Sequence, residues 1–169
     1  ALFEAAGIEF SNKDRRKVTS SVIGFTIAPR INATGRIGNA ERAVKLFISE
    51  HREEAESLAE EFCIINKERQ DTETEILAEV IREIEEKRMH ETDTVLVIAG
   101  DNWHHGVIGI VASRITEKYS RPSILVSFEG MFFHNVFLAN ARFGEGLLPN
   151  AQTVFPVSIP CIHIRNILL

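Results

Sequence analysis

Apolar residues recur at helical spacing over much of this chain. Residues 40–47 form a short amphipathic pattern that predicts a helix. From about Glu50 to about Glu91 the chain contains no Gly or Pro, and one apolar stripe runs through Leu58, Phe62, Ile65, Ile76, Val80 and Ile84. We therefore expect a single long helix of about 60 Å at 1.5 Å per residue. Its stripe is interrupted at Arg69 and Thr72, which disfavours a coiled-coil dimer and favours a connector between two lobes.

A strand, a helix and a second strand are predicted after this connector. The apolar run 94–100 ends in Gly, residues 106–119 repeat with helical spacing, and residues 123–128 form another β-branched run. Short connections between these elements predict a βαβ unit with parallel strands. The fold class we expect is α/β, with a long connecting helix between the end of one α/β domain and an incomplete βαβ-type domain, followed by an irregular C-terminal tail.

The two ends of the chain follow other patterns. A basic cluster at 13–17 precedes the alternating stretch Val18 to Phe25, and residues 28–39 are rich in Gly, Asn and Pro, which predicts a loop. Residues 131–169 hold only Arg142, Glu145 and Arg165 as charged residues, and no period is visible there. We expect four regions: a domain end at 1–39, connecting helices at 40–91, a domain start at 92–130 and an atypical tail at 131–169.

Charge and cysteine content narrow the classes of protein. The net charge of −5 is concentrated in residues 41–91, where 8 Lys and Arg face 16 Asp and Glu, so it does not argue against nucleic-acid binding elsewhere. Cys63 and Cys161 have no Cys or His partners at metal-binding spacing, and we interpret them as free thiols. No apolar run approaches the roughly 18 residues of a membrane span, and no secretory signal is visible. We expect a cytoplasmic protein.

The segment 28–39 is the first candidate for chemistry. Arg30 and Arg36 flank Asn32, and Gly35 and Gly38 leave the main chain open. A guanidinium group suits bidentate phosphate recognition, and glycines allow a phosphodiester to approach the backbone. The same arginines are equally compatible with helix capping or with pairing to the acidic helix, so composition leaves both roles open.

The second candidate is the segment 101–109, which follows the first strand of the βαβ unit. Ligands bind at such carboxyl ends, and the first amides of the next helix attract anions. Trp103 could stack on a base and His104 or His105 could contact a phosphate beside Gly106, although a structural role fits these residues as well. Neighbouring histidines seldom share a metal ion, and we expect no metal here. No combination of nucleophile, base and acid is visible in the sequence.

Three motifs together resemble the RecJ family of the DHH phosphoesterase superfamily. They are Ile27–Gly38, the helical segment 66–70 (Asn-Lys-Glu-Arg-Gln) and Trp103–Arg114, and the resemblance runs through residues 1–130 in the order of the family. It implies the C-terminal end of the DHH domain, the connecting helix and the start of the DHH-associated domain. It also implies that Arg30, Asn32, Arg36, Trp103, His104 and Gly106 contact nucleic acid, and it favours His104 as the functional histidine, because the family pattern leaves position 105 variable.

The resemblance implies an enzyme of DNA repair and recombination that removes nucleotides from the 5′ end of single-stranded DNA. The full-length parent would use two manganese or magnesium ions, held by motifs that include Asp-His-His. This sequence has no such triplet, so we expect the chain alone to bind no metal and to be inactive, as a monomer whose partner is single-stranded DNA. The alternatives are a DHH phosphodiesterase of short oligonucleotides or cyclic dinucleotides, and a non-enzymatic helical interaction module.

The resemblance stops at Gly130. The family continues there with a Lys-Gly-Ser-Gly-Arg-Ser-like segment and later a Gly-Gly-His motif, and residues 131–169 contain neither. A shifted reading frame or an unrelated replacement would explain the change. Translating the coding DNA in its other two frames tests the frameshift, because the missing motifs would then appear in one of them.

Overall fold

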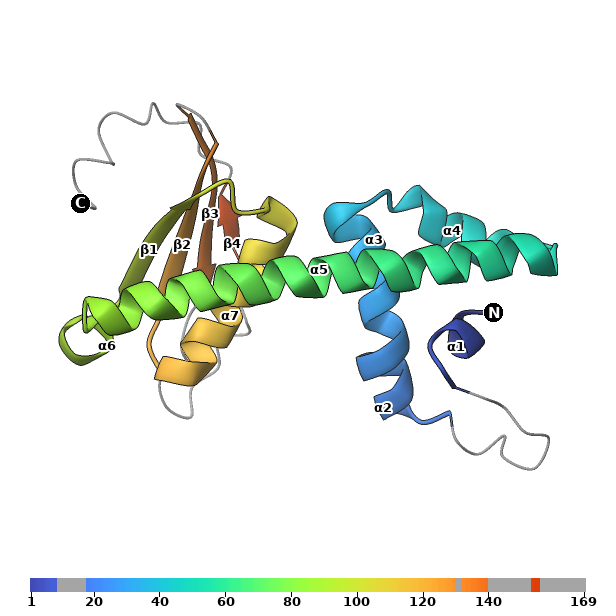
Figure 1. Ribbon diagram of the computed structural model, residues 1–169, viewed down its shortest axis with the longest axis horizontal. Coiled ribbons are helices and arrows are strands. Elements are labelled where there is room, and N and C mark those ends of the chain that lie inside the picture. Colours follow the sequence, from blue (N-terminus) through green and yellow to red (C-terminus); the bar gives the residue numbers. More distant parts are fainter. Residues whose placement is uncertain (9–17, 130–131, 140–152, 156–169) are drawn as a thin grey trace. The chain divides into compact units, whose positions relative to one another are not determined.

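The computed structural model describes residues 1–8, 18–129, 132–139 and 153–155. The chain divides into two compact units, Ala1–Asp71 and Thr72–Leu169. The boundary lies within the long helix α5, Arg52–Glu86, which therefore contributes its first part to unit 1 and its last part to unit 2 (Figure 1). The long helix predicted from the apolar stripe is confirmed, although it ends earlier than expected, at Glu86.

All regular secondary structure in the described part of unit 1 is helical. It contains α1 (Leu2–Ala5), α2 (Ser20–Val22), a π-helix at Ile23–Ile27, α3 (Ala28–Ile37), α4 (Glu41–Ile48) and the first part of α5. The core consists of Leu2, Ile27, Ala59 and Phe62, and partly buried residues of α3 and α4 pack against it. The helix predicted at 40–47 is confirmed.

The prediction of a loop at 28–39 is wrong, because residues 28–37 form the helix α3. Pro29 sits in the first turn of this helix, where its fixed φ is favourable and its missing N–H costs nothing. Ala33 and Thr34 are fully buried, and the Thr34 hydroxyl donates to the carbonyl of Ile31 at 2.8 Å. Burial of this side compensates for Gly35, which is a poor helix former, and the alternating stretch before Pro29 is helical as well.

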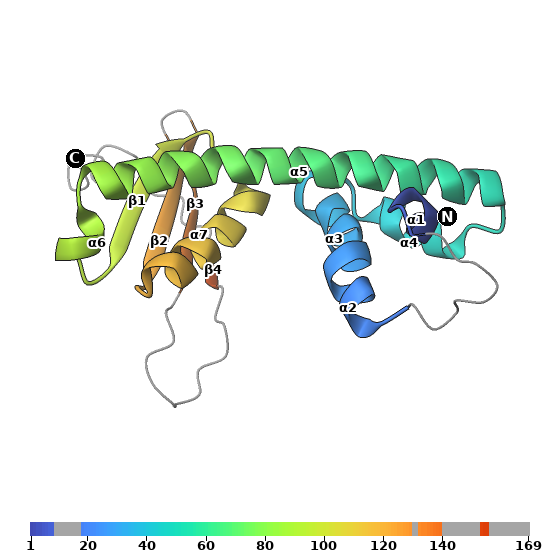
Figure 2. The ribbon, with the colours of Figure 1, turned by 60° about the horizontal axis from the view of Figure 1, so that its bottom comes forward.

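Unit 2 is an α/β unit built on a mixed sheet. Its described strands are β1 (Leu96–Asp101), β2 (Ser123–Glu129), β3 (Phe132–Ala139) and β4 (Thr153–Phe155), in the order β1-β2-β3-β4. Strands β1 and β2 are parallel and connected by α7 (His105–Tyr119), so the predicted βαβ unit and the α/β class are confirmed. A short helix α6 (Met89–Thr92) follows α5 after Arg88, which has a left-handed backbone (Figure 2).

The larger part of the core of unit 2 lies on one face of this sheet, and Val126 and Phe128 form a smaller buried cluster on the other face. Val80 and Ile84 of α5 are fully buried, as are Leu96 and Ile98 of β1 and the apolar side of α7. Each part of α5 thus fills the core of its own unit, which explains why one apolar stripe is interrupted midway. The division of the sequence at 39, 91 and 130 into a domain end, a connector and a domain start stays a prediction.

Most of the expected irregular tail lies outside the described residues. Phe132–Ala139 is an exception, because it forms β3 antiparallel to β2, with a register irregularity between Ser127 and Phe128. This strand was not predicted, because the sequence of residues 131–169 shows no clear period. Its run of aromatic and β-branched residues nevertheless has high strand propensity, and β2 supplies the neighbour that such a segment needs.

Candidate nucleic-acid interface

The exposed face of α3 is the first candidate surface, in unit 1. Asn32, Gly35 and Arg36 have the spacing i, i+3, i+4, which places them on one side of the helix. Asn32 and Gly35 are exposed, and Arg36 is half-buried. A Cβ built on Gly35 would meet only the Ala40 Cβ, at 3.9 Å, so the main chain is open at this point. The arrangement offers an amide, a guanidinium group and accessible backbone side by side.

Arg30 lies differently from the other predicted contact residues of α3. Its guanidinium is half-buried, with Nη1 donating to the carbonyl oxygen of Thr26 at 2.5 Å and Nε donating to Cys63 Sγ at 3.3 Å. The Cys63 thiol in turn donates to the carbonyl oxygen of Ala5 at 3.4 Å. Arg30 therefore joins the π-helix to α5, which is a structural role of the kind that the sequence left open.

The turn before α7 is the second candidate surface, in unit 2. His104 is the N-cap of α7, and its Nδ1 accepts a hydrogen bond from the Gly106 amide at 3.1 Å. Neutral His104 therefore carries its proton on Nε2, which is left as a donor. Burial, and to a smaller extent the neighbouring His105, lower the pKa of His104, and the two rings stack with centroids 4.8 Å apart. The neutral form is thus the favoured one.

Trp103 is buried and does not present its ring. The side chain is 5% exposed, and its indole Nε1 donates to Glu79 Oε2 of α5 at 2.9 Å. A Cβ built on Gly100 would lie 2.1 Å from the Trp103 ring, so the indole packs directly on the main chain of β1. The hydroxyl of Ser127 also donates to the Trp103 carbonyl at 2.8 Å. Stacking of Trp103 on a base does not fit this placement, because the ring is already covered on the protein side.

The six predicted residues thus fall into two groups. The structure brings Arg30, Asn32 and Arg36 together on α3, and it brings Trp103, His104 and Gly106 together at the start of α7. Sequence reasoning missed Cys63 and Glu79, which hold Arg30 and Trp103. Both lie on α5, where periodicity indicates burial but gives no sign of a partner far away in sequence.

Two polar side chains of α5 are buried, Asn66 and Glu73. Glu73 is 3% exposed and forms an ion pair with Arg114 of α7 through Nε at 2.5 Å. Asn66 is buried as well, and its Oδ1 accepts a hydrogen bond from Arg69 Nη2 at 3.3 Å. The interruption of the apolar stripe therefore marks buried polar groups with partners.

Metal clusters and membrane spans are both absent from the described part of the chain. Within it, no group of three His, Cys, Asp or Glu side chains is arranged to hold a metal ion, so these residues do not fit a two-metal centre. Among the same residues, no helix is both long enough and apolar enough to cross a membrane.

Comparison with known proteins identifies relatives of one kind. No protein-family profile matches the chain. It is 39% identical over 122 residues to the single-stranded-DNA-specific exonuclease RecJ of Bacillus subtilis, covering 72% of this chain and 15% of the relative. It is 36% identical over 164 residues to the protein of the same name in Escherichia coli, covering 95% of this chain and 25% of the relative. The second match extends beyond residue 130.

Solved structures show the same relationship. RecJ of Thermus thermophilus in complex with Mg²⁺ matches with a TM-score of 0.65 and 30% identity, over 88% of this chain and 20% of that one. An exonuclease RecJ bound to manganese matches with a TM-score of 0.62 and 31% identity, over 88% of this chain and 32% of that one. The chain therefore spans between about a seventh and a third of the length of these proteins.

Proposed function

The chain belongs to the RecJ family, and from this premise we propose that it works as a segment of a 5′→3′ single-stranded-DNA exonuclease, to which it contributes contacts with the DNA backbone. The proposal is supported by relatives named single-stranded-DNA-specific exonuclease that align with up to 95% of the chain. The family relationship favours this role over a phosphodiesterase of cyclic dinucleotides and over a purely helical interaction module.

The exposed face of α3 is the observation that carries the proposed DNA contact. Asn32 and Arg36 share one side of the helix next to the open main chain at Gly35. A guanidinium group can donate two parallel hydrogen bonds to one phosphate, and an amide can add a third. These contacts read no base, which suits an enzyme that must degrade any sequence. Arg30 supports this face from behind through Thr26 and Cys63.

The start of α7 is proposed as a second contact, with His104 as the donor. Its Nε2–H remains available because Nδ1 is occupied by the Gly106 amide. A neutral donor can hold a phosphate without a titrating charge at neutral pH. Trp103 acts indirectly here, since its packing on Gly100 fixes the backbone that leads into His104.

We assign metal binding to the full-length parent enzyme and not to the described residues of this chain. The related structures contain Mg²⁺ or manganese, and the family reaction is phosphodiester hydrolysis. Because the described residues do not fit a two-metal centre, no catalytic step is assigned to them. Binding and orientation of the strand is the chemistry that remains for this chain.

A salt titration of single-stranded-DNA binding tests the proposal. Arg36→Ala should weaken binding of an oligothymidine about fivefold and reduce the slope of log affinity against log salt by about one, because one phosphate contact is lost. Arg82→Ala removes the same charge from an exposed position of α5 and is the matched control. Equal effects of the two substitutions would show that only net charge matters, and the assignment of α3 would be wrong.

A further inference from the structure

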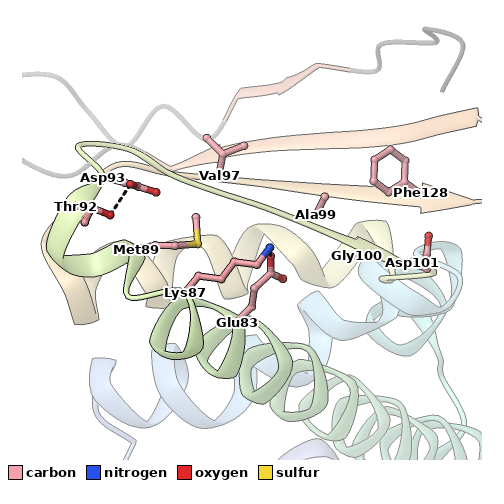
Figure 3. A pocket seen from close by; sticks show the side chains of 10 residues that line it. All are labelled: Glu83, Lys87, Met89, Thr92, Asp93, Val97, Ala99, Gly100, Asp101 and Phe128. Atoms are coloured by element: carbon pink, nitrogen blue, oxygen red, sulfur yellow. Dashed lines mark hydrogen bonds and ion pairs between the residues drawn. The ribbon is translucent and has the colours of Figure 1, made fainter. Parts of the chain in front are cut away.

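A cavity of about 400 Å³ lies in unit 2, between β1 and the helical segment that precedes it. Figure 3 shows Val97, Ala99 and Asp101 on the strand side, with Glu83, Lys87 and Met89 on the helical side. This volume is within the range of ligand pockets in proteins. None of the proposed DNA-contact residues lines the cavity, so the proposed DNA binding does not explain why the cavity is there.

The main chain of β1 is open toward this cavity. Strand β1 stands first in the sheet order, and β2 is its single neighbour among the described strands. The amides of Leu96 and Asn102 donate to carbonyls on the β2 side, at 2.9 and 2.8 Å. Alternate residues of a parallel strand bond to the same neighbour, so the even-numbered residues face β2. Val97, Ala99 and Asp101 then direct their N–H and C=O groups to the open edge, and the same three residues line the cavity.

The edge of β1 lacks the sequence features that protect exposed strands, although residues of α5 and α6 form the opposite wall of the cavity. Natural edge strands are blocked by Pro, by Lys, by β-bulges or by a covering helix, which prevent association with other chains. The sequence of β1, Leu-Val-Ile-Ala-Gly-Asp, has no Pro and no basic residue, and its register with β2 is regular. An apolar, regular edge of this kind is suited to pairing with one more strand.

Charge around the cavity indicates what that strand carries. Glu83 and Lys87 pair with each other at 3.1 Å, so the remaining charges of the lining are the carboxylates of Asp93 and Asp101. Asp93 Oδ1 accepts a hydrogen bond from the Thr92 hydroxyl at 2.7 Å, and Arg121 donates to the Asp93 carbonyl at 2.6 Å, so Asp101 is the carboxylate with the greater share of free acceptor capacity. Met89 and Phe128 supply an apolar surface between them. Two carboxylates disfavour a nucleic-acid strand by like-charge repulsion and favour a cationic side chain.

We propose that the open edge of β1 binds an extended segment of a partner protein that carries Lys or Arg, by addition of a strand to the sheet. Main-chain hydrogen bonds to Val97, Ala99 and Asp101 supply the pairing, and Asp93 and Asp101 select the basic side chains. This site is separate from the proposed DNA contacts on α3 and His104, and it stands whether or not those contacts are confirmed.

Amide protection measured by NMR on the 169-residue chain tests the proposal. The probe is a fluorescein-labelled peptide of about six residues that alternates Val and Lys, with a Val and Glu peptide as its matched control. The lysine peptide should bind and slow exchange of the amides of Val97, Ala99 and Asp101. The amides of Ile98 and Gly100 should not change, because they already face β2. Equal binding of the two peptides, or no binding of either, would overturn the proposal.

Two variants separate backbone pairing from charge. Ala99→Pro removes one outward N–H at an edge position that tolerates Pro and should weaken peptide binding about tenfold, whereas Ala99→Val keeps the N–H and should bind normally. Asp93→Asn combined with Asp101→Asn should weaken binding about fivefold without removing any main-chain group. If a longer form of the protein protects these amides without peptide, the strand is its own and the partner proposal is wrong.

Discussion

The two candidate contact regions differ in how many of their side chains make contacts that stabilise the fold. The turn before α7 is anchored by Trp103, whose ring packs on Gly100 and whose indole N–H bonds to Glu79. The exposed face of α3 has no comparable anchor on Asn32 or Gly35, which are both exposed. The turn before α7 therefore uses an aromatic side chain to hold unit 2, whereas α3 has no aromatic residue and leaves the Asn32 amide exposed.

A sequence motif can therefore indicate where a candidate site lies without indicating whether its residues bind a ligand or stabilise the fold. In unit 2 a glycine is required at position 100, just before the motif, because the Trp103 ring occupies the space that a side chain would need. In unit 1, Gly35 has no bulky neighbour, and a Cβ there would meet only the Ala40 Cβ, at 3.9 Å. Substitutions at matched positions should separate these two requirements.

Trp103→Ala should have the largest effect and should fall on unit 2 alone. Removing a buried aromatic side chain costs about 3–5 kcal/mol of unfolding free energy through lost burial and the cavity left behind. Hydrogen exchange of the β1 and α7 amides measures the loss, and the amides of α3 report unit 1 in the same experiment. Protection should fall in the first set and persist in the second.

Glu79→Gln is the control for the indole hydrogen bond. It retains an acceptor for Trp103 Nε1 and removes only the charge, at an exposed position of α5. We expect a loss below about 1 kcal/mol. If Trp103→Ala cost no more than Glu79→Gln, the ring would contribute little packing and the contrast between the two regions would disappear.

Gly100→Ala and Gly35→Ala should have effects of opposite sign. The new methyl at position 100 would clash with the Trp103 ring, and overpacking of this kind costs about 1–3 kcal/mol. The methyl at position 35 meets ordinary contact distances, and replacing a helical Gly by Ala stabilises by about 1 kcal/mol. Urea unfolding followed by circular dichroism measures both, and Trp103, the single tryptophan, reports unit 2 by fluorescence.

The position 35 variant also tests function. If a phosphodiester approaches the main chain at Gly35, the added methyl should weaken single-stranded-DNA binding while the protein becomes more stable. Unchanged DNA affinity in Gly35→Ala would leave Arg36 as a contact and remove the role of the open backbone.

Much of the secondary structure could be predicted from the sequence because its signals are local. The apolar stripe of α5 and the βαβ unit depend on spacing within one element, and both were predicted. Helix α3 was not, because Pro, Asn and Gly favour loops on average and only the burial of Ala33 and Thr34 decides otherwise. Strand β3 likewise depends on its neighbour β2.

The candidate sites could be located from the sequence, but their internal contacts could not. Arg30 and Cys63 are separated by 33 residues, and Trp103 and Glu79 by 24, so no periodicity connects them. These contacts change the roles of Arg30 and Trp103 from binding groups to supports. Asn32, Arg36 and His104 remain the proposed binding residues.

The smallest expected effect is the pH dependence carried by His104. Its pKa is lower in the folded protein than in the unfolded chain, so the unfolded state binds more protons at acidic pH. The contribution of His104 to stability is therefore complete above the unfolded pKa of about 6.5 and is lost as the pH falls below it. Protonation also removes the Nδ1 acceptor that caps α7.

His104→Asn separates the cap from the titration. Asn is among the best N-cap residues and does not titrate, so this variant should keep the stability of α7 near neutral pH and lose its acid sensitivity. His104→Ala should be about 1 kcal/mol less stable than the parent near neutral pH, because the cap is gone, and this difference should shrink at acidic pH, where the parent histidine is protonated and loses the same cap. Unfolding in urea at several pH values between about 5 and 8 distinguishes the variants, since the histidine is half-protonated near 6.5 when unfolded. If the asparagine variant retained the acid sensitivity of the parent, the titrating group would be elsewhere, and the Nε2–H of a neutral His104 would lose its support as a DNA donor.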